Sequence, residues 1–279
     1  MLSVKIPMRR RAAWEHWVLL LSDVHFDSIK CDRELLQKHL KEAKNRAASI
    51  VSTGDFFDLM QGKLDPRQAK DALREEYLAE NYLDAVIDDA AAFLRPYADY
   101  IVMMGDGNHE TSVRKRLETC PTSRLLQELC GGRKHKIAHG HYAGWLRFNF
   151  VEERGPQRYQ SLLHYHHGSG LKSKMSHHRR GMICPDADIF TYGHFHEFWF
   201  DYVARYRLSA DNVVRQDSQL HLGIPGYKDD VKEGAGGWAI EKNLAPQPRG
   251  AWWLRYRLDQ GRIDGKNACR LVVEPHVCR

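Results

Sequence analysis

The first hundred residues alternate short apolar runs with stretches of helical periodicity. Three runs predict buried strands, at residues 16–21, 49–53 and 100–104. Between them, residues 32–48 and 69–94 place apolar side chains near one helical face, and the first of these stretches begins with an aspartate suited to capping a helix. Strand, helix, strand, helix, strand is typical of an α/β domain that is built around a partly parallel sheet.

The pattern of apolar and polar residues changes after residue 140, where short β-like runs dominate. These runs predict strands at 145–151, 160–165, 188–191, 198–206, 219–222, 238–241, 252–258 and 269–273. Two sheets that share one core fit this order better than two independent domains. We therefore expect a single domain over residues 1–279, with a motif-bearing core at 16–230 and a β-rich C-terminal extension of the same domain at 231–279.

Composition limits the class of protein. Hydrophobic residues make up 43% and charged residues 28%, as in an ordinary soluble globular protein. The longest apolar run near the start, residues 17–21, is too short for a membrane span or a signal-peptide core. The six cysteines form no CxxC pair, which argues against a disulfide framework and a cysteine-type zinc site. We expect a cytoplasmic protein with reduced thiols and no membrane partner.

Polar side chains follow the strand-like runs. Ligands of α/β sheets collect at the carboxyl ends of strands, and five segments at such ends carry oxygen or imidazole donors beside glycine. They are Ser22–His25, Gly54–Asp58, Gly107–Glu110, His166–Gly168 and Tyr192–His196. One such triplet arises by chance often, but five in order, each after a strand-like run, predict a metal site.

These segments read DxH, GDxxD, GNH(D/E), HG and GHxH, in that order, and the chain resembles the calcineurin-like metallophosphoesterase superfamily. The resemblance implies a four-layer αββα sandwich of two mixed sheets, with a dinuclear metal centre at one edge. It implies that one metal is held by Asp23, His25, Asp55 and His196. It implies that the second metal is held by Asp55, Asn108, His167 and His194, so that Asp55 bridges the two.

The donor types suit a phosphoesterase. Mixed oxygen and imidazole ligands favour Mn²⁺, Fe or Zn²⁺ over Ca²⁺ or Mg²⁺, and we expect two divalent ions, Mn²⁺ first, with Fe, Zn²⁺ or Ni²⁺ as alternatives. Two such ions about 3.5–4 Å apart clamp a phosphoryl group and supply a bridging hydroxide at neutral pH. The expected enzyme is a metal-dependent hydrolase of phosphoesters.

A proton donor for the leaving group is also expected. In the family that the chain resembles, the histidine of GNH(D/E) stands beside the metals, which implies a catalytic role for His109. Asp58, the last residue of GDxxD, resembles its carboxylate partner, with a loop or helix cap as the alternative. For Glu110 we favour a structural, capping role. Among the clustered His164, His166 and His167, the family's ligand position before glycine selects His167.

The basic charge is concentrated. The net charge is +6, yet residues 101–180 alone hold 14 lysines and arginines against 6 acidic residues. Such an excess favours an anionic partner, with scattered solvated side chains as the alternative. The expected substrate contacts, for which a solvated charged face is the alternative, are Lys172, Lys174, His178, Arg179, Arg180 and Arg114.

We therefore favour a nuclease or phosphodiesterase that acts on DNA, RNA or nucleotides. A phosphomonoesterase acting on proteins or small molecules is the first alternative, and a non-catalytic metal-binding scaffold is the second. Two further features receive no functional role. His135, His139 and His141 lack a spacing that the metal site needs, and the aromatic residues Trp252, Trp253 and Tyr256 favour core packing over base stacking.

Overall fold

Two six-stranded mixed sheets face each other in the computed structural model, which describes residues 1–9, 14–60, 73–78, 80–132, 135–168, 186–208, 212–229, 246–263 and 266–278. Sheet I has the order β1 (Leu2–Met8), β6 (Ala143–Glu152), β7 (Arg158–His166), β8 (Ile189–Tyr192), β10 (Val214–Gly223), β9 (Trp199–Leu208). Sheet II has the order β12 (Lys266–Cys278), β11 (Ala251–Ile263), β2 (Glu15–Leu21), β3 (Ser49–Ser52), β4 (Ile101–Gly105), β5 (Ala138–His141). Each sheet combines parallel and antiparallel pairs, so the expected α/β fold with two mixed sheets is confirmed.

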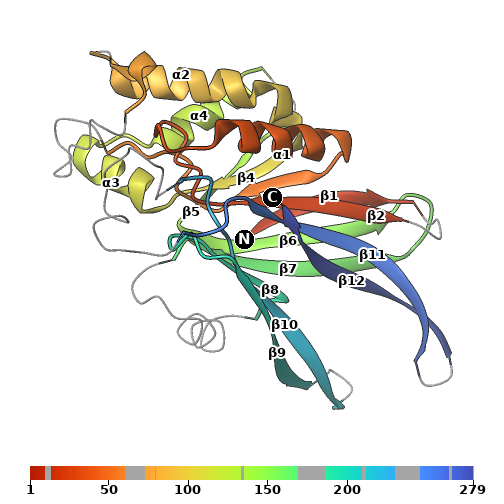
Figure 1. The fold of residues 1–279 in the computed structure, drawn as a ribbon. Helices are drawn as coiled ribbons and strands as arrows, with labels where there is room; N and C mark the ends of the chain where they lie inside the picture. Colours follow the sequence, from red (N-terminus) through yellow and green to blue (C-terminus); the bar gives the residue numbers. More distant parts are fainter. Residues whose placement is uncertain are drawn as a thin grey trace.

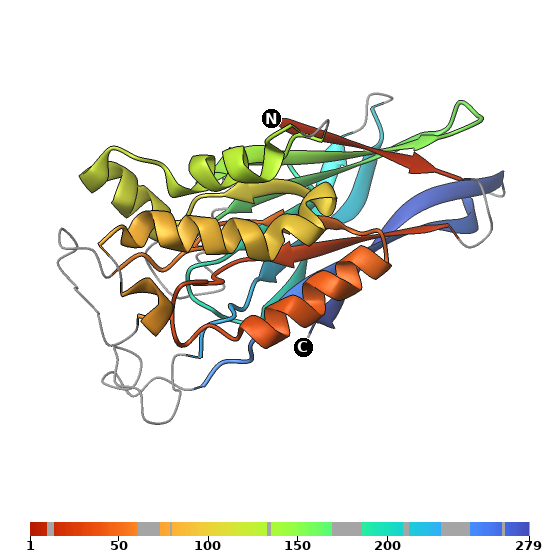
Figure 2. The same cartoon turned by 90° about the horizontal axis from the view of Figure 1, so that it is seen from above.

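Four α-helices lie on the outer side of sheet II (Figures 1 and 2). They are α1 (Arg33–Asn45), α2 (Tyr82–Leu94), α3 (Asn108–Leu117) and α4 (Pro121–Cys130), with short 3-10 helices η2 (Glu75–Tyr77) and η3 (Arg95–Tyr100) beside them. Three of the four expected layers are thus seen, and within the described ranges no helix covers the outer face of sheet I. None of the helices in those ranges is long and apolar enough to cross a membrane.

Strand β2 shows how the two layers of core arise. Side chains alternate along a strand, so Val18 and Leu20 face sheet I while Leu19 and Leu21 face the helices, and all four are at most 2% exposed. A strand that is buried on both faces reads as a continuous apolar run, which is why the sequence indicates it clearly.

Helix α1 begins where the sequence predicts. Asp32 caps it by accepting a hydrogen bond from the backbone N–H of Leu35 at 3.0 Å. The helix ends at Asn45, three residues before the expected boundary, because Ala47 adopts a left-handed φ of 50° that a helix cannot continue through.

The continuous helix expected over residues 69–94 is wrong in its described part. Residues 61–72 and 79 lie outside the described ranges, Glu75–Tyr77 form a 3-10 turn, and the α-helix begins only at Tyr82. The chain turns here because the Tyr77 side chain is buried, 2% exposed, with its hydroxyl against Arg33 and Asp89. The strand expected at 238–241 also lies outside the described ranges.

The C-terminal strands join sheet II directly. Strand β11 pairs antiparallel with β2, and Trp252, Trp253 and Tyr256 are at most 3% exposed, so core packing is confirmed for these aromatic residues. Five cysteines in the described part of the chain are free thiols: Cys31, Cys120, Cys130, Cys269 and Cys278.

A partly buried histidine in β2, His16, should make the fold acid-sensitive. Burial lowers the pKa of His16 to about 4 from an unfolded value near 6.5. The unfolded chain therefore binds the proton first, and the free energy of unfolding should decrease as the pH falls from about 6.5 to 4, by on the order of 2–3 kcal/mol. His16→Gln keeps a polar group near Ser49 Oγ but removes the titrating imidazole. Between about pH 6.5 and 4, the free energy of unfolding of this variant should fall by less than that of the wild type, and the difference should equal the contribution of His16. Urea titrations of the metal-free proteins measure both values. Equal losses in the two proteins would contradict this assignment.

Candidate metal centre

Seven donor residues meet at one end of the sandwich. Because β2, β3 and β4 run parallel, as do β7 and β8, their carboxyl ends bring separate loops together. From sheet II come Asp23 and His25 after β2, Asp55 after β3 and Asn108 at the start of α3. From sheet I come His167 after β7, and His194 and His196 after β8. All seven residues expected from the sequence as metal ligands thus lie in one place.

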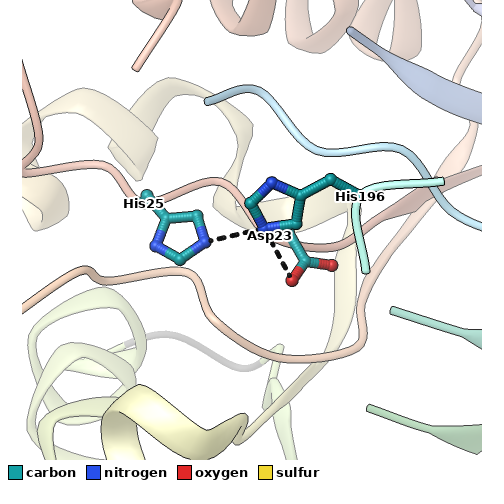
Figure 3. A group of neighbouring side chains, drawn as sticks. All are labelled: Asp23, His25 and His196. Atoms are coloured by element: carbon teal, nitrogen blue, oxygen red, sulfur yellow. Dashed lines mark hydrogen bonds and ion pairs between the residues drawn. The ribbon is translucent and has the colours of Figure 1, made fainter. Parts of the chain in front are cut away.

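The first donor group consists of Asp23, His25 and His196 (Figure 3). The Nε2 atom of His196 lies 3.2 Å from Nε2 of His25 and 3.4 Å from Oδ1 of Asp23. Ligand atoms that share one metal at about 2.0–2.2 Å are separated by roughly 3 Å, so this spacing fits a common cation.

The second donor group consists of Asp55, Asn108, His167 and His194. Nε2 of His167 lies 3.0 Å from Oδ2 of Asp55 and 3.1 Å from Oδ1 of Asn108, and that same oxygen is 2.7 Å from Nδ1 of His194. Oxygen and imidazole donors again converge within reach of one ion.

Asp55 connects the two groups. Its carboxylate also forms a cluster with His25 and His109, all donor atoms lying within 4.8 Å of one another. Asp23 approaches the second group as well, with Oδ1 4.0 Å from Nε2 of His167. The bridging position that the resemblance implies for Asp55 is therefore compatible with the geometry.

The charge balance fits cations. Asp23 and Asp55 are at most 2% exposed, and their ion-pair partners in the described part of the chain are imidazoles. Burial alone would raise the pKa of both carboxyls, but the imidazole of His167 above all lowers it, and for Asp55 well below the usual range. Burial likewise opposes the imidazolium of His167, yet the carboxylates of Asp55 and Asp23 raise its pKa to about 9. The two buried carboxylates therefore need a positive charge between them. The imidazolium of His167 supplies it here, and a bound metal ion would supply it as well.

A carboxylate orients one of the imidazoles. Nδ1–H of His25 donates to Oδ1 of Asp58 at 2.8 Å, so Nε2 of His25 keeps its lone pair and directs it toward His196. Asp58 also accepts from Nζ of Lys228 at 2.9 Å. Burial opposes ionisation of Asp58, but Lys228 and His25 hold its pKa well below the usual range. Such outer partners fix the tautomer and ring orientation of metal-binding histidines.

His109 stands beside both groups. Its backbone N–H donates to Oδ1 of Asp55 at 2.9 Å, and its Nδ1–H donates to the backbone carbonyl of Asp58 at 2.5 Å. A carbonyl only accepts, so Nδ1 carries the hydrogen, and Nε2 faces Oδ2 of Asp55 at 3.8 Å. Asp58 thus orients His109 through its main chain, while its carboxylate lies 3.8 Å away and serves His25.

The backbone is strained at most of these positions. Left-handed φ angles are uncommon for residues other than glycine and cost on the order of 1–3 kcal/mol each. Five of the seven donor residues adopt them: Asp23 (52°), His25 (49°), Asp55 (46°), His194 (73°) and His196 (53°). Strain of this kind persists only where the surrounding structure holds it, and it concentrates at functional sites.

Two buried carboxylates hold the backbone of the loops that follow β3 and β4. Glu110 accepts hydrogen bonds from the backbone N–H groups of Asp55, Phe57 and Gly107, which confirms the expected capping role. Asp27, which the sequence analysis missed, accepts from the backbone N–H groups of Asp58 and Leu59. Its position two residues beyond the DxH motif was the available signal.

Arg114 does not lie among the donors. It pairs with Oδ2 of Asp106 at 3.2 Å, and Oδ1 of Asp106 contacts Nε2 of His139 at 2.8 Å. Asp106 immediately precedes Gly107-Asn108, so this network fixes the loop that presents Asn108. The side chain of Arg114 remains 45% exposed, which leaves a substrate contact open to test. The other expected contacts, Lys172, Lys174, His178, Arg179 and Arg180, lie outside the described ranges.

Gly107 leaves no room for a side chain. A Cβ atom placed there would lie 2.0 Å from Oδ1 of Asp55, whereas one at Gly131 would have no neighbour closer than 3.5 Å. Gly107→Ala should therefore displace Asp55 and lower the amount of bound divalent metal, while Gly131→Ala should not. Metal content after gel filtration, measured by elemental analysis, tests this prediction. Full metal content in a folded Gly107→Ala protein would contradict it.

Comparisons with known proteins give weak likenesses. No family model and no curated protein matches the chain. Among solved structures, vacuolar protein sorting 29 from Cryptosporidium parvum is 12% identical, with a TM-score of 0.40, and the match covers 95% of this chain and 100% of that one. A Thermotoga maritima protein is 12% identical over 93% of this chain and 99% of its own, with a TM-score of 0.34. GAP50, the anchor in the inner membrane complex of Plasmodium, is 13% identical over 95% and 88%, with a TM-score of 0.38.

Proposed function

We propose that this chain is a calcineurin-like metallophosphoesterase that hydrolyses phosphodiester bonds with two divalent metal ions. The observation that carries the proposal is the convergence of seven donors in two groups around Asp55. Non-catalytic scaffolds have no need for a complete donor set. The oriented imidazole of His109 beside that set favours a catalyst over the scaffold alternative.

The metal ions, Asp58 and His109 would have distinct roles in hydrolysis. Two divalent ions bound there would supply Lewis-acid stabilisation of a phosphoryl oxygen and an activated water. Asp58 holds His109 in one tautomer through its carbonyl, and it aims His25 through its carboxylate. When both of its ring nitrogens are protonated, His109 would give the Nε2 proton to the departing oxygen, which would otherwise leave as a strongly basic alkoxide, and would keep its Nδ1–H on the Asp58 carbonyl.

Nucleic acid is the substrate class we favour, with Mn²⁺ as the metal. The basic excess over residues 101–180 supports a polyanionic substrate, because local positive charge attracts phosphate backbones. Of the six expected substrate contacts, Arg114, half-exposed beyond the loop of Asn108, is the one that lies in the described part of the chain.

A substrate panel separates the alternatives. Protein loaded with Mn²⁺ should cut single- or double-stranded DNA or RNA and hydrolyse bis-p-nitrophenyl phosphate. An enzyme that leaves all nucleic acids intact but hydrolyses p-nitrophenyl phosphate would be a phosphomonoesterase. Inactivity toward every phosphoester, with metal bound, would favour the scaffold.

A further inference from the structure

Strand β9 (Trp199–Leu208) is the last strand at one edge of sheet I. It pairs on one side with β10, and no strand in the described part of the chain pairs with its other side. An edge of ten residues presents a row of backbone N–H and C=O groups that can pair with another strand. The strand begins three residues after His196 and, with β10, leads away from the helical layer (Figure 1), so a partner there would not cover α1–α4.

One face of this edge is apolar and exposed. Because side chains alternate, the even-numbered residues share a face. Phe200 is 50% exposed, Tyr202 49%, Tyr206 78% and Leu208 66%, and Ala204 between them is also exposed. Natural proteins protect long edges with charge, proline or a covering element, so an exposed apolar face on an edge of this length marks an interaction surface.

The sequence of β9 is complementary to itself. An antiparallel pair centred on Ala204 would set Phe200 opposite the partner's Leu208 and Tyr202 opposite the partner's Tyr206. On the other face it would set Asp201 opposite the partner's Arg207, a side chain that also pairs with Asp186 and Asp217 of its own chain. Aromatic and apolar pairs, and opposite charges, stabilise directly opposed positions of antiparallel strands.

We propose that two copies of this chain associate through their β9 strands, antiparallel about a twofold axis at Ala204. The contact is isologous, so it closes at a dimer and does not propagate into fibres. It joins the two copies of sheet I into one continuous sheet and covers the backbone groups of both edges. The self-matching register, which opposes apolar and aromatic side chains on one face and Asp201 and Arg207 on the other, selects a second copy over an unrelated partner.

Sedimentation equilibrium tests the association. The wild type should form a dimer at micromolar concentration. Tyr206→Lys, which sets a cation opposite the partner's Tyr202 within the apolar face, should raise the dimer dissociation constant by tenfold or more. Leu78→Lys is the matched control, since Leu78 is an apolar side chain 70% exposed away from β9. Its dissociation constant should equal that of the wild type.

A cysteine cross-link tests the register. Ala204 is the one position of β9 that would oppose its own copy, so Ala204→Cys should form a covalent dimer under mild oxidation. Ser218→Cys, at the residue paired with Ala204 but on the inner strand β10, should not. A wild type that stays monomeric at all concentrations, or an Ala204→Cys protein that forms no more covalent dimer than the wild type, would overturn the proposal. Neither readout depends on metal or activity.

Discussion

Asp55→Asn should remove both the bound metal and the hydrolytic activity. Oδ2 of Asp55 faces His167 at 3.0 Å, and Oδ1 receives the backbone N–H of His109, so the carboxylate stands at the junction of the two donor groups. An amide removes the negative charge and replaces one acceptor by a donor. Because the loss of an outer partner of a metal ligand already costs about 10–100-fold in affinity or activity, the loss of a shared ligand should cost more than about 100-fold.

Elemental analysis and Mn²⁺-dependent hydrolysis of bis-p-nitrophenyl phosphate measure the two effects. Asp88→Asn is the matched control, because Asp88 is an exposed aspartate on α2 outside the donor groups, and it should behave as the wild type. An Asp55→Asn protein that keeps its metal content and its rate would show that the donor groups do not hold catalytic ions.

His109→Gln should leave the metal bound and lower kcat in a way that depends on the leaving group. The contact of His109 with Asp55 Oδ1 runs through the backbone N–H, which the substitution keeps. General acid catalysis contributes typically about 10²–10⁴-fold where the departing oxygen needs a proton. On DNA, whose leaving oxygen is strongly basic, kcat should fall by that order. On bis-p-nitrophenyl phosphate, whose phenolate departs unprotonated, kcat should fall much less.

The ratio of the two losses is the informative quantity. Parallel measurements of kcat on both substrates, with metal content determined on the same preparations, remove the effect of incomplete loading. Equal losses on both substrates would contradict a proton-donor role and would favour His109 as a positioning residue for Asp55.

The donor set could be predicted from the sequence because its signals are local. Strands such as β2 and β3 are buried on both faces and read as apolar runs, and each donor follows such a run within a few positions. Strand β5 has no such pattern: its four residues, Ala138–His141, include two histidines and a glycine. The 3-10 turn before α2 was missed because it depends on the burial of Tyr77 against Arg33, a contact across 44 positions.

Motif spacing could not assign the partners of Asp58. The pattern GDxxD indicates that an acidic residue lies near His109, but it cannot distinguish a carboxylate contact from a carbonyl contact. The side chain turns to His25 because Lys228 stands on the same side, 170 positions along the chain in a segment without a motif. Contacts of that range are set by how the two sheets pack, which no local pattern reports.

The origin of the donors in both sheets has a mechanical consequence. His25 belongs to sheet II and His196 to sheet I, and they are 171 positions apart in the chain. A cation held by both would act as a reversible cross-link that the unfolded polypeptide cannot form, because its ends would have to find each other across that span. By mass action, this cross-link adds about 4 kcal/mol to the free energy of unfolding when the concentration of free metal is a thousand times the dissociation constant of the metal site. The cellular supply of the metal would then set how long the folded chain survives as well as how fast it works.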